Sequence, residues 1–253
     1  MKWACGLTTV PERVGDLLPR TLQSLRAAGF QAPRLFIDGA ECFTHQDCFE
    51  KLNCPMTFRW PRIGSFGNWA IGLWELYVRN PEVDRYIMFE DDLIAVKNLR
   101  IYLDQCKYPR LGYWNLYTHV PNQERLPGTI GWHQASKKGL GALALVFSRD
   151  AVQTLLQSKS FVLHSAGSDH KRRTRAQDGC VYTSMKNVGW QEYVHDPSLV
   201  QHTGEESVTG QTVVNGEQFR HSKHPLAVSF PGEDFDALTL LKERPPCETA
   251  TAP

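Results

Sequence analysis

The stretch that most constrains this chain is a short apolar run that ends in three consecutive acids, Glu90, Asp91 and Asp92. The run itself, Tyr86–Phe89, is apolar, rich in aromatic residues and bounded by charge, which predicts a buried strand. Three carboxylates at a strand end repel one another, so a positive charge must compensate them. A divalent cation would do so, because Mg²⁺ and Mn²⁺ prefer oxygen ligands. The alternative is that Asp91 and Asp92 cap a helix that begins near Lys97.

The residues before this run predict an α/β fold. Trp3–Val10 has the pattern of a strand, Leu17–Gly29 that of an amphipathic helix, and Arg34–Gly39 that of a second strand. This spacing implies two parallel strands joined by a right-handed crossover. Ligands of such sheets bind beyond the carboxyl ends of the strands, where four polar residues fall: Thr8, Thr9, Arg13 and Asp38. Ordinary loop chemistry, with hydroxyls satisfying the backbone and an Asp-Gly turn, also explains them.

The three acids after an apolar strand resemble the DxD element of GT-A-fold, nucleotide-sugar-dependent glycosyltransferases, in the form of the N-acetylglucosaminyltransferase I type. The resemblance implies a single α/β domain with a GT-A-like (Rossmann-like), mostly parallel central sheet flanked by helices. It also implies a UDP-sugar donor and Mn²⁺ or Mg²⁺ as cofactor. By position, Asp92 would hold the metal, Asp91 would contact the ribose or a water, and Glu90 would lie behind them. The nucleotide and sugar would also contact Thr8, Thr9, Arg13 and Asp38.

Two later landmarks extend the resemblance. Asp178 opens a predicted helix, and in inverting members of the family an acid in the corresponding place is the catalytic base. His202, in the sequence Val-Gln-His-Thr-Gly, resembles the C-terminal histidine that completes the metal shell in that family. The implied reaction is a single displacement in which Asp178 accepts a proton from the acceptor hydroxyl. The residues alone leave two ordinary roles open: Asp178 as a helix N-cap and His202 as a hydrogen-bonded polar residue.

Two further segments contain candidate binding residues. Asn68 lies near the start of a strongly amphipathic predicted helix, where it would face a diphosphate or serve as a turn and cap residue. Residues 119–138 are polar, rich in Pro and Gly, and without periodicity, which predicts a binding loop or lid. This loop carries four candidate acceptor or phosphate contacts: Trp132, His133, Lys137 and Lys138.

A basic run precedes the predicted base and contains Lys171, Arg172, Arg173 and Arg175. Cations beside an acceptor site suit a polyanion. The chain is similar to GT-A glycosyltransferases proposed to modify hydroxymethylated pyrimidines in phage and kinetoplastid DNA. The similarity implies transfer of glucose from UDP-glucose to 5-hydroxymethylpyrimidine in DNA, with Trp132 or His133 stacking on the extruded base or filling its gap. A bacterial surface-glycan precursor or a small molecule is the competing acceptor.

Two other function classes remain open from the sequence. A nucleotidyltransferase also uses carboxylate-held metals on an α/β sheet. A non-catalytic zinc and nucleic-acid-binding module would combine the basic run with Cys42, His45, Cys48 and Cys54, whose residue types suit zinc although their spacing matches no established zinc pattern. The Gly-rich helix start that marks dehydrogenases and kinases is absent from the sequence, which argues against those classes.

Bulk properties set the remaining expectations. The net charge of +1 argues against a broadly basic nucleic-acid binder. We expect a catalytic domain over residues 1–210 and a C-terminal extension over residues 211–253, with disorder in residues 242–253. The sequence shows no signal peptide and no apolar stretch long enough to cross a membrane. The expected location is therefore the cytoplasm, where the seven cysteines would be reduced.

Overall fold

The computed structural model describes residues 1–40, 49–136, 138–165, 177–203, 212–214, 217–219 and 226–242, and a central sheet of eight strands organises them. The strands lie in the order β3 (Met56–Arg59), β2 (Arg34–Asp38), β1 (Trp3–Thr9), β4 (Arg85–Glu90), β8 (Ala144–Ser148), β6 (Gly112–Asn115), β9 (Gln191–Asp196) and β7 (Gly131–Gln134). The first four strands are parallel, and β6 is parallel to β9. Only β8 and the edge strand β7 run against their neighbours. The mostly parallel α/β sheet predicted from the sequence is confirmed.

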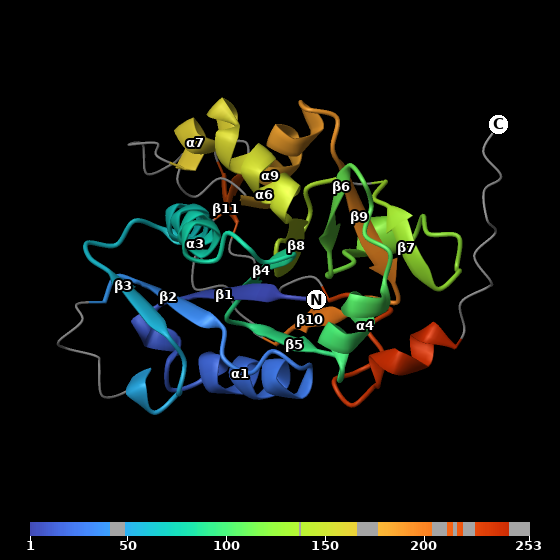
Figure 1. Cartoon of the computed structure of the whole chain (residues 1–253), viewed down its shortest axis with the longest axis horizontal. Helices are drawn as coiled ribbons and strands as arrows, with labels where there is room; N and C mark the ends of the chain where they lie inside the picture. Colours follow the sequence, from blue (N-terminus) through green and yellow to red (C-terminus); the bar gives the residue numbers. More distant parts are fainter. Residues whose placement is uncertain are drawn as a thin grey trace.

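Helices cover both faces of this sheet (Figure 1). One face packs on α1 (Leu17–Ala27) and α4 (Leu99–Gln105), and the other packs on α3 (Ser65–Arg79), α6 (Arg149–Gln157), α7 (Lys159–Ser165) and α9 (Gln177–Lys186). The two cores follow from strand geometry, because successive side chains of a strand point to opposite faces. In β2, Leu35 and Ile37 lie in the first core, whereas Phe36 between them lies in the second.

A second, two-stranded sheet brings the C-terminal half of the chain to the acidic end of β4. It pairs β5 (Leu93–Ala95) with β10 (Val200–His202) in antiparallel fashion, so that His202 lies opposite Leu93. The N–H of Thr203 donates to the carbonyl of Asp92 at 2.8 Å. The helix-cap alternative for Asp91 and Asp92 is therefore wrong, because a strand follows these acids directly.

Two segments hold more regular structure than the sequence predicts. The expected loop at residues 119–138 contains the short helix α5 (Val120–Gln123) and the edge strand β7. The expected C-terminal extension contains the antiparallel strands β11 (Thr212–Val214) and β12 (Glu217–Phe219) and the 3₁₀ helix η2 (Ala237–Leu241). These elements are three to five residues long, too short for hydrophobic periodicity to reveal them.

Residues 226–242 pack against the same domain. Ala227, Ala237 and Leu240 are buried in the core that α1 and α4 cover. The backbone of Lys97 bonds to Phe235 and Ala237, which fixes this segment beside α4. A boundary at residue 210 stays a prediction, and residues 243–253 lie outside the described part of the chain. Within the described ranges, no helix is both long enough and apolar enough to cross a bilayer.

Candidate active site

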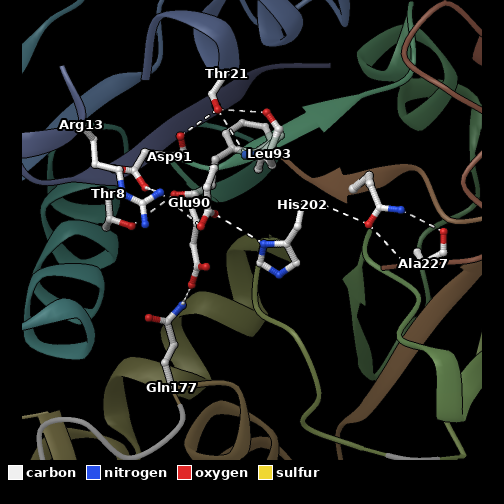
Figure 2. Close-up of polar contacts among 12 residues, drawn as sticks. Thr8, Arg13, Thr21, Glu90, Asp91, Leu93, Gln177, His202 and Ala227 are labelled. Atoms are coloured by element: carbon white, nitrogen blue, oxygen red, sulfur yellow. Dashed lines mark hydrogen bonds and ion pairs between the residues drawn. The ribbon is translucent and has the colours of Figure 1, made fainter. Parts of the chain in front are cut away.

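The acids that end β4 are held by a buried arginine (Figure 2). Asp91 and Asp92 are only 7% and 5% exposed. Arg13, from the 3₁₀ turn η1 (Pro11–Arg13), places Nη1 3.3 Å from Asp91 Oδ1 and 3.2 Å from Asp92 Oδ2. The sequence placed Arg13 on the nucleotide sugar, yet its guanidinium is a built-in counter-charge for the acids. Even without a charge on Glu90, one guanidinium faces two carboxylates, which leaves room for a further positive charge.

Asp91 is fixed from both sides. Its Oδ2 accepts a 2.6 Å hydrogen bond from Thr9 Oγ1, and its carbonyl accepts one of 2.8 Å from Thr21 Oγ1. Burial raises its pKa to about 6, although Arg13 and the Thr9 hydroxyl oppose this rise. Both carboxylate oxygens of Asp91 have protein partners, so Asp91 anchors the cluster, and its contact with a ribose or a water stays a prediction. Thr8 likewise donates to a backbone carbonyl, that of Phe89, at 3.3 Å.

Asp92 and His202 face each other across the β4 end. His202 Nδ1 lies 3.7 Å from Asp92 Oδ1, because the pairing of β5 with β10 brings the histidine to this point. In an octahedral site with bonds of about 2.1 Å, adjacent ligand atoms lie about 3 Å apart and opposite ones about 4 Å apart. One carboxylate and one imidazole at this separation therefore fit Mn²⁺ or Mg²⁺. The described residues include no group of three or more His, Cys, Asp or Glu that could hold a metal ion, so further ligands would come from substrate and water.

Asp178 sits in the first turn of α9 and is tied to two backbone amides. Its Oδ1 accepts from Gly179 N–H and its Oδ2 from Gly141 N–H, both at 2.8 Å. Burial raises the pKa of Asp178, and the two amides oppose the rise. Burial is the largest influence on this pKa, and the basic run that precedes Asp178 lies outside the described residues.

Glu90 connects the acidic strand end to α9. Gln177 Nε2 donates to Glu90 Oε1 at 3.3 Å, which links the start of α9 to the end of β4. Burial raises the pKa of Glu90 to about 8, and the negative charges of Asp92, Asp91 and Asp178 add to the rise. Asp178 therefore lies within electrostatic reach of the metal-ligand candidates, and Glu90 holds a proton near neutral pH.

Sequence reasoning missed two residues of this site, His119 and Tyr117. The Tyr117 ring packs edge-on between two imidazoles, with centroids 6.0 Å from His119 and 5.3 Å from His202. His119 Nδ1 is buried and has no hydrogen-bond partner within the described part of the chain. Burial lowers the pKa of His119, whereas Asp178 raises it. The sequence alone does not identify His119 as a site residue, because it lies in the connection after β6, where the sequence has no helix or strand pattern.

Asp38 and Asn68, two of the expected nucleotide contacts, are buried and hydrogen-bond to other parts of the protein. Asp38, 2% exposed, accepts from the N–H groups of Ile63 and Gly64, both at 2.8 Å. Asn68, 1% exposed, accepts from Arg59 Nε and donates to a backbone carbonyl of β2, again at 2.8 Å. The prediction that Asn68 faces a diphosphate is wrong, because its amide is buried and bonded at both ends. Asp38 lies at the carboxyl end of β2 as expected, but both of its oxygens organise the start of α3.

The predicted acceptor residues fall into two groups. Trp132 is partly buried and stacks on the buried Trp114, with ring centroids 4.4 Å apart and planes 9° apart, and its predicted role of stacking on a base or filling its gap stays a prediction. His133 Nε2 contacts the carbonyl of Thr129 at 2.7 Å, and Lys138 Nζ lies 5.8 Å from the centre of the Tyr182 ring. The remaining candidates lie outside the described residues: Lys137, Lys171, Arg172, Arg173, Arg175, Cys42, His45 and Cys48. The fourth zinc candidate, Cys54, is a buried free thiol.

No protein-family model matches this chain, and no curated protein matches it. Among solved structures, it is similar to GalNAc-T7 with UDP, GalNAc and Mn²⁺, at a TM-score of 0.54 and 11% identity over 79% of this chain. The matched region spans 44% of the GalNAc-T7 chain. The chain is also similar, at lower TM-scores, to a cytidylyltransferase from Leptospira borgpetersenii (TM-score 0.45, 9% identity, 96% of this chain and 93% of that chain). A Drosophila β-1,4-galactosyltransferase 7 mutant with manganese, UDP-Gal and xylobiose matches at a TM-score of 0.42 and 10% identity, over 84% of this chain and 77% of that chain. The likeness to GalNAc-T7 shows the fold alone, and that fold is the GT-A-like α/β arrangement.

Proposed function

We propose that this protein is a metal-dependent glycosyltransferase that moves a sugar from a UDP-sugar to an acceptor hydroxyl. The observation that carries the proposal is the approach of His202 Nδ1 to Asp92 Oδ1, 3.7 Å, at the carboxyl end of a GT-A-like sheet. Its support is threefold: a fold shared with a protein solved with UDP and Mn²⁺, a paired carboxylate and imidazole, and a buried acid on α9 beside them.

Asp92 and His202 would hold the Mn²⁺ or Mg²⁺, which when bound supplies positive charge against the diphosphate. Arg13 keeps Asp91 and Asp92 close together despite their repulsion, since its guanidinium contacts both. Thr9 and Thr21 fix the backbone and side chain of Asp91, so the neighbouring Asp92 is held in one orientation. These contacts pre-organise the donor site before any ligand arrives.

Asp178 is the proposed general base. It accepts the proton of the acceptor hydroxyl as that oxygen bonds to the anomeric carbon and the bond to UDP breaks. A carboxylate whose pKa is raised by burial is a better proton acceptor near neutral pH than an exposed one. The N–H groups of Gly141 and Gly179 hold the carboxylate in place while leaving a lone pair on each oxygen.

The test is UDP release from a panel of UDP-sugars with Mn²⁺ or with EDTA. We expect Asp178→Asn to lower kcat by about 10²–10⁴-fold with the KM for donor kept, because shape is retained and the proton acceptor is lost. Asp92→Ala should abolish turnover without unfolding the protein, and Asp234→Ala, at an exposed ion pair with Lys97, is the control. Near-normal turnover of Asp92→Ala with added metal contradicts the assignment, and pyrophosphate release from a nucleoside triphosphate would instead assign a nucleotidyltransferase.

As the finer assignment we propose UDP-glucose as donor and 5-hydroxymethylpyrimidine in DNA as acceptor, in the cytoplasm. Its support is the basic run of the sequence, together with Lys138 among the described residues. Labelled UDP-glucose offered with hydroxymethylated and unmodified DNA tests it. Label on the hydroxymethylated DNA only, fading as salt rises, is the expected result. Transfer to a glycan or lipid-linked acceptor with no labelled DNA would overturn it.

A further inference from the structure

A buried acid and a buried amide lie behind Asp178, and the proposed mechanism does not use them. Glu192 in β9 is 1% exposed, and Asn115 at the end of β6 is fully buried. The parallel pairing of β6 with β9 brings them together, and Asn115 Nδ2 donates to Glu192 Oε1 at 3.0 Å. Burial of a carboxyl group is unfavourable, so a fully hydrogen-bonded buried acid calls for a physical reason.

Asn115 and Glu192 both form hydrogen bonds with a tight turn, residues 139–141. Glu192 Oε2 accepts from the N–H of Gly139 at 2.7 Å. Asn115 Nδ2 also reaches the carbonyls of Leu140 at 3.1 Å and Gly141 at 2.8 Å. Two side chains therefore fix three backbone polar groups of a three-residue turn.

The same turn contacts Asp178. The N–H of Gly141 donates to Asp178 Oδ2 at 2.8 Å. The turn also packs directly on α9: a Cβ placed on Gly139 would lie 3.0 Å from Gly179 Cα and 3.2 Å from the Asp178 carbonyl. Because there is no free space between turn and helix, displacement of the turn displaces the Asp178 carboxylate.

We propose that Asn115 and Glu192 are positioning residues that hold the 139–141 turn so that the Gly141 N–H fixes the orientation of the Asp178 carboxylate. This inference rests on the proposed role of Asp178 as the base. The chemistry explains why position 192 is an acid: both of its oxygens face N–H donors, one on Asn115 and one on Gly139. The ionised carboxylate, which predominates above about pH 7, accepts at both places, whereas a glutamine accepts at one.

Glu192→Gln is therefore the informative change, since it keeps the shape and removes one hydrogen bond. The matched control is Glu75→Gln on α3, where another hydrogen-bonded acid contacts Thr57 and Arg79 away from Asp178. The first measurement is hydrogen exchange of the Gly141 amide by NMR, which needs no turnover. The second is the steady-state kinetics of UDP release from UDP-glucose with Mn²⁺, and thermal unfolding monitors the fold.

We expect Glu192→Gln to speed Gly141 exchange and to lower kcat by about ten- to a hundred-fold, with the KM for UDP-glucose unchanged. Glu75→Gln should alter neither. If Glu192→Gln does not fold, Asn115→Ser removes the amide donor instead and should have the same two effects. Unchanged Gly141 exchange, or faster exchange with unchanged kcat, overturns the inference. Absence of UDP release by the wild type counts against the proposed function, and the exchange measurement then decides by itself whether the pair holds the turn.

Discussion

At the scale of single residues, the acidic end of β4 is organised by partners drawn from distant parts of the chain. Arg13 comes from the loop after β1, Thr21 from α1, and His202 from β10. The sequence showed that three adjacent acids need a counter-charge, and it named Arg13 and His202 as site residues. It did not show that Arg13 contacts the acids directly, because that contact depends on how η1 folds over the strand end.

Replacement of Arg13 by Gln should strongly destabilise the protein. Removing one partner of a buried ion pair leaves uncompensated charge and costs about 3–5 kcal/mol, whereas an exposed pair contributes about 0–1 kcal/mol. Arg62→Gln, at the exposed pair with Glu12, is the control. Urea unfolding measures both free energies, and we expect Mn²⁺ to stabilise Arg13→Gln more than the wild type. Equal losses in the two variants would show that Arg13 is not the counter-charge of the cluster.

At the scale of secondary-structure elements, the strands and helices with long periodic patterns were predictable and the short ones were not. The apolar run before Glu90 became β4, and the amphipathic pattern around Trp69 became α3. Edge strand β7 has only four residues, and its position follows from pairing with β9, a long-range contact that local sequence does not encode. The same holds for His119, whose place in the site depends on the chain path after β6.

Gly141→Ala tests the packing of the 139–141 turn at this scale. Gly141 has φ of +72°, and an added Cβ would collide with the Tyr117 ring. Gly128 has a similar φ of +69° with nothing within 4 Å of an added Cβ, so Gly128→Ala is a matched control that keeps the backbone strain and lacks the collision. In urea unfolding, we expect Gly128→Ala to lower the free energy of unfolding by about 1–2 kcal/mol and Gly141→Ala to lower it clearly more. Equal losses of unfolding free energy in the two variants would mean that the Tyr117 ring moves aside without cost, which would contradict the tight packing.

At the scale of the whole molecule, buried acids should shape the pH dependence of stability. Burial raises the pKa of Glu192 from 4.5 to about 7, so the folded state holds this proton where the unfolded state has released it. This contribution is present below about pH 4.5 and is lost as pH rises through about 7. Burial also raises the pKa of Glu75, but hydrogen bonds from Thr57 and Arg79 outweigh it and lower the net value. Its contribution is present above its unfolded pKa and is lost as pH falls.

The opposite pKa shifts of Glu192 and Glu75 therefore predict opposite trends of stability with pH. In unfolding free energies measured from pH 4 to 8, Glu192→Gln should lose stability relative to the wild type mainly at low pH, and Glu75→Gln mainly at high pH. If the loss of unfolding free energy relative to the wild type changed with pH in the same direction for both variants, these pKa directions would be contradicted.

Calorimetric titration of Mn²⁺ and UDP tests the metal site most directly. We expect the wild type to bind UDP with Mn²⁺ far more tightly than with EDTA. Asp92→Asn and His202→Ala should lose this metal-dependent gain, whereas Asp178→Asn should keep it, because Asp178 is assigned to the acceptor and not to the metal. UDP affinity that is the same with Mn²⁺ and with EDTA, or a metal-dependent gain that survives in Asp92→Asn, would contradict a metal-dependent glycosyltransferase site at Asp92 and His202.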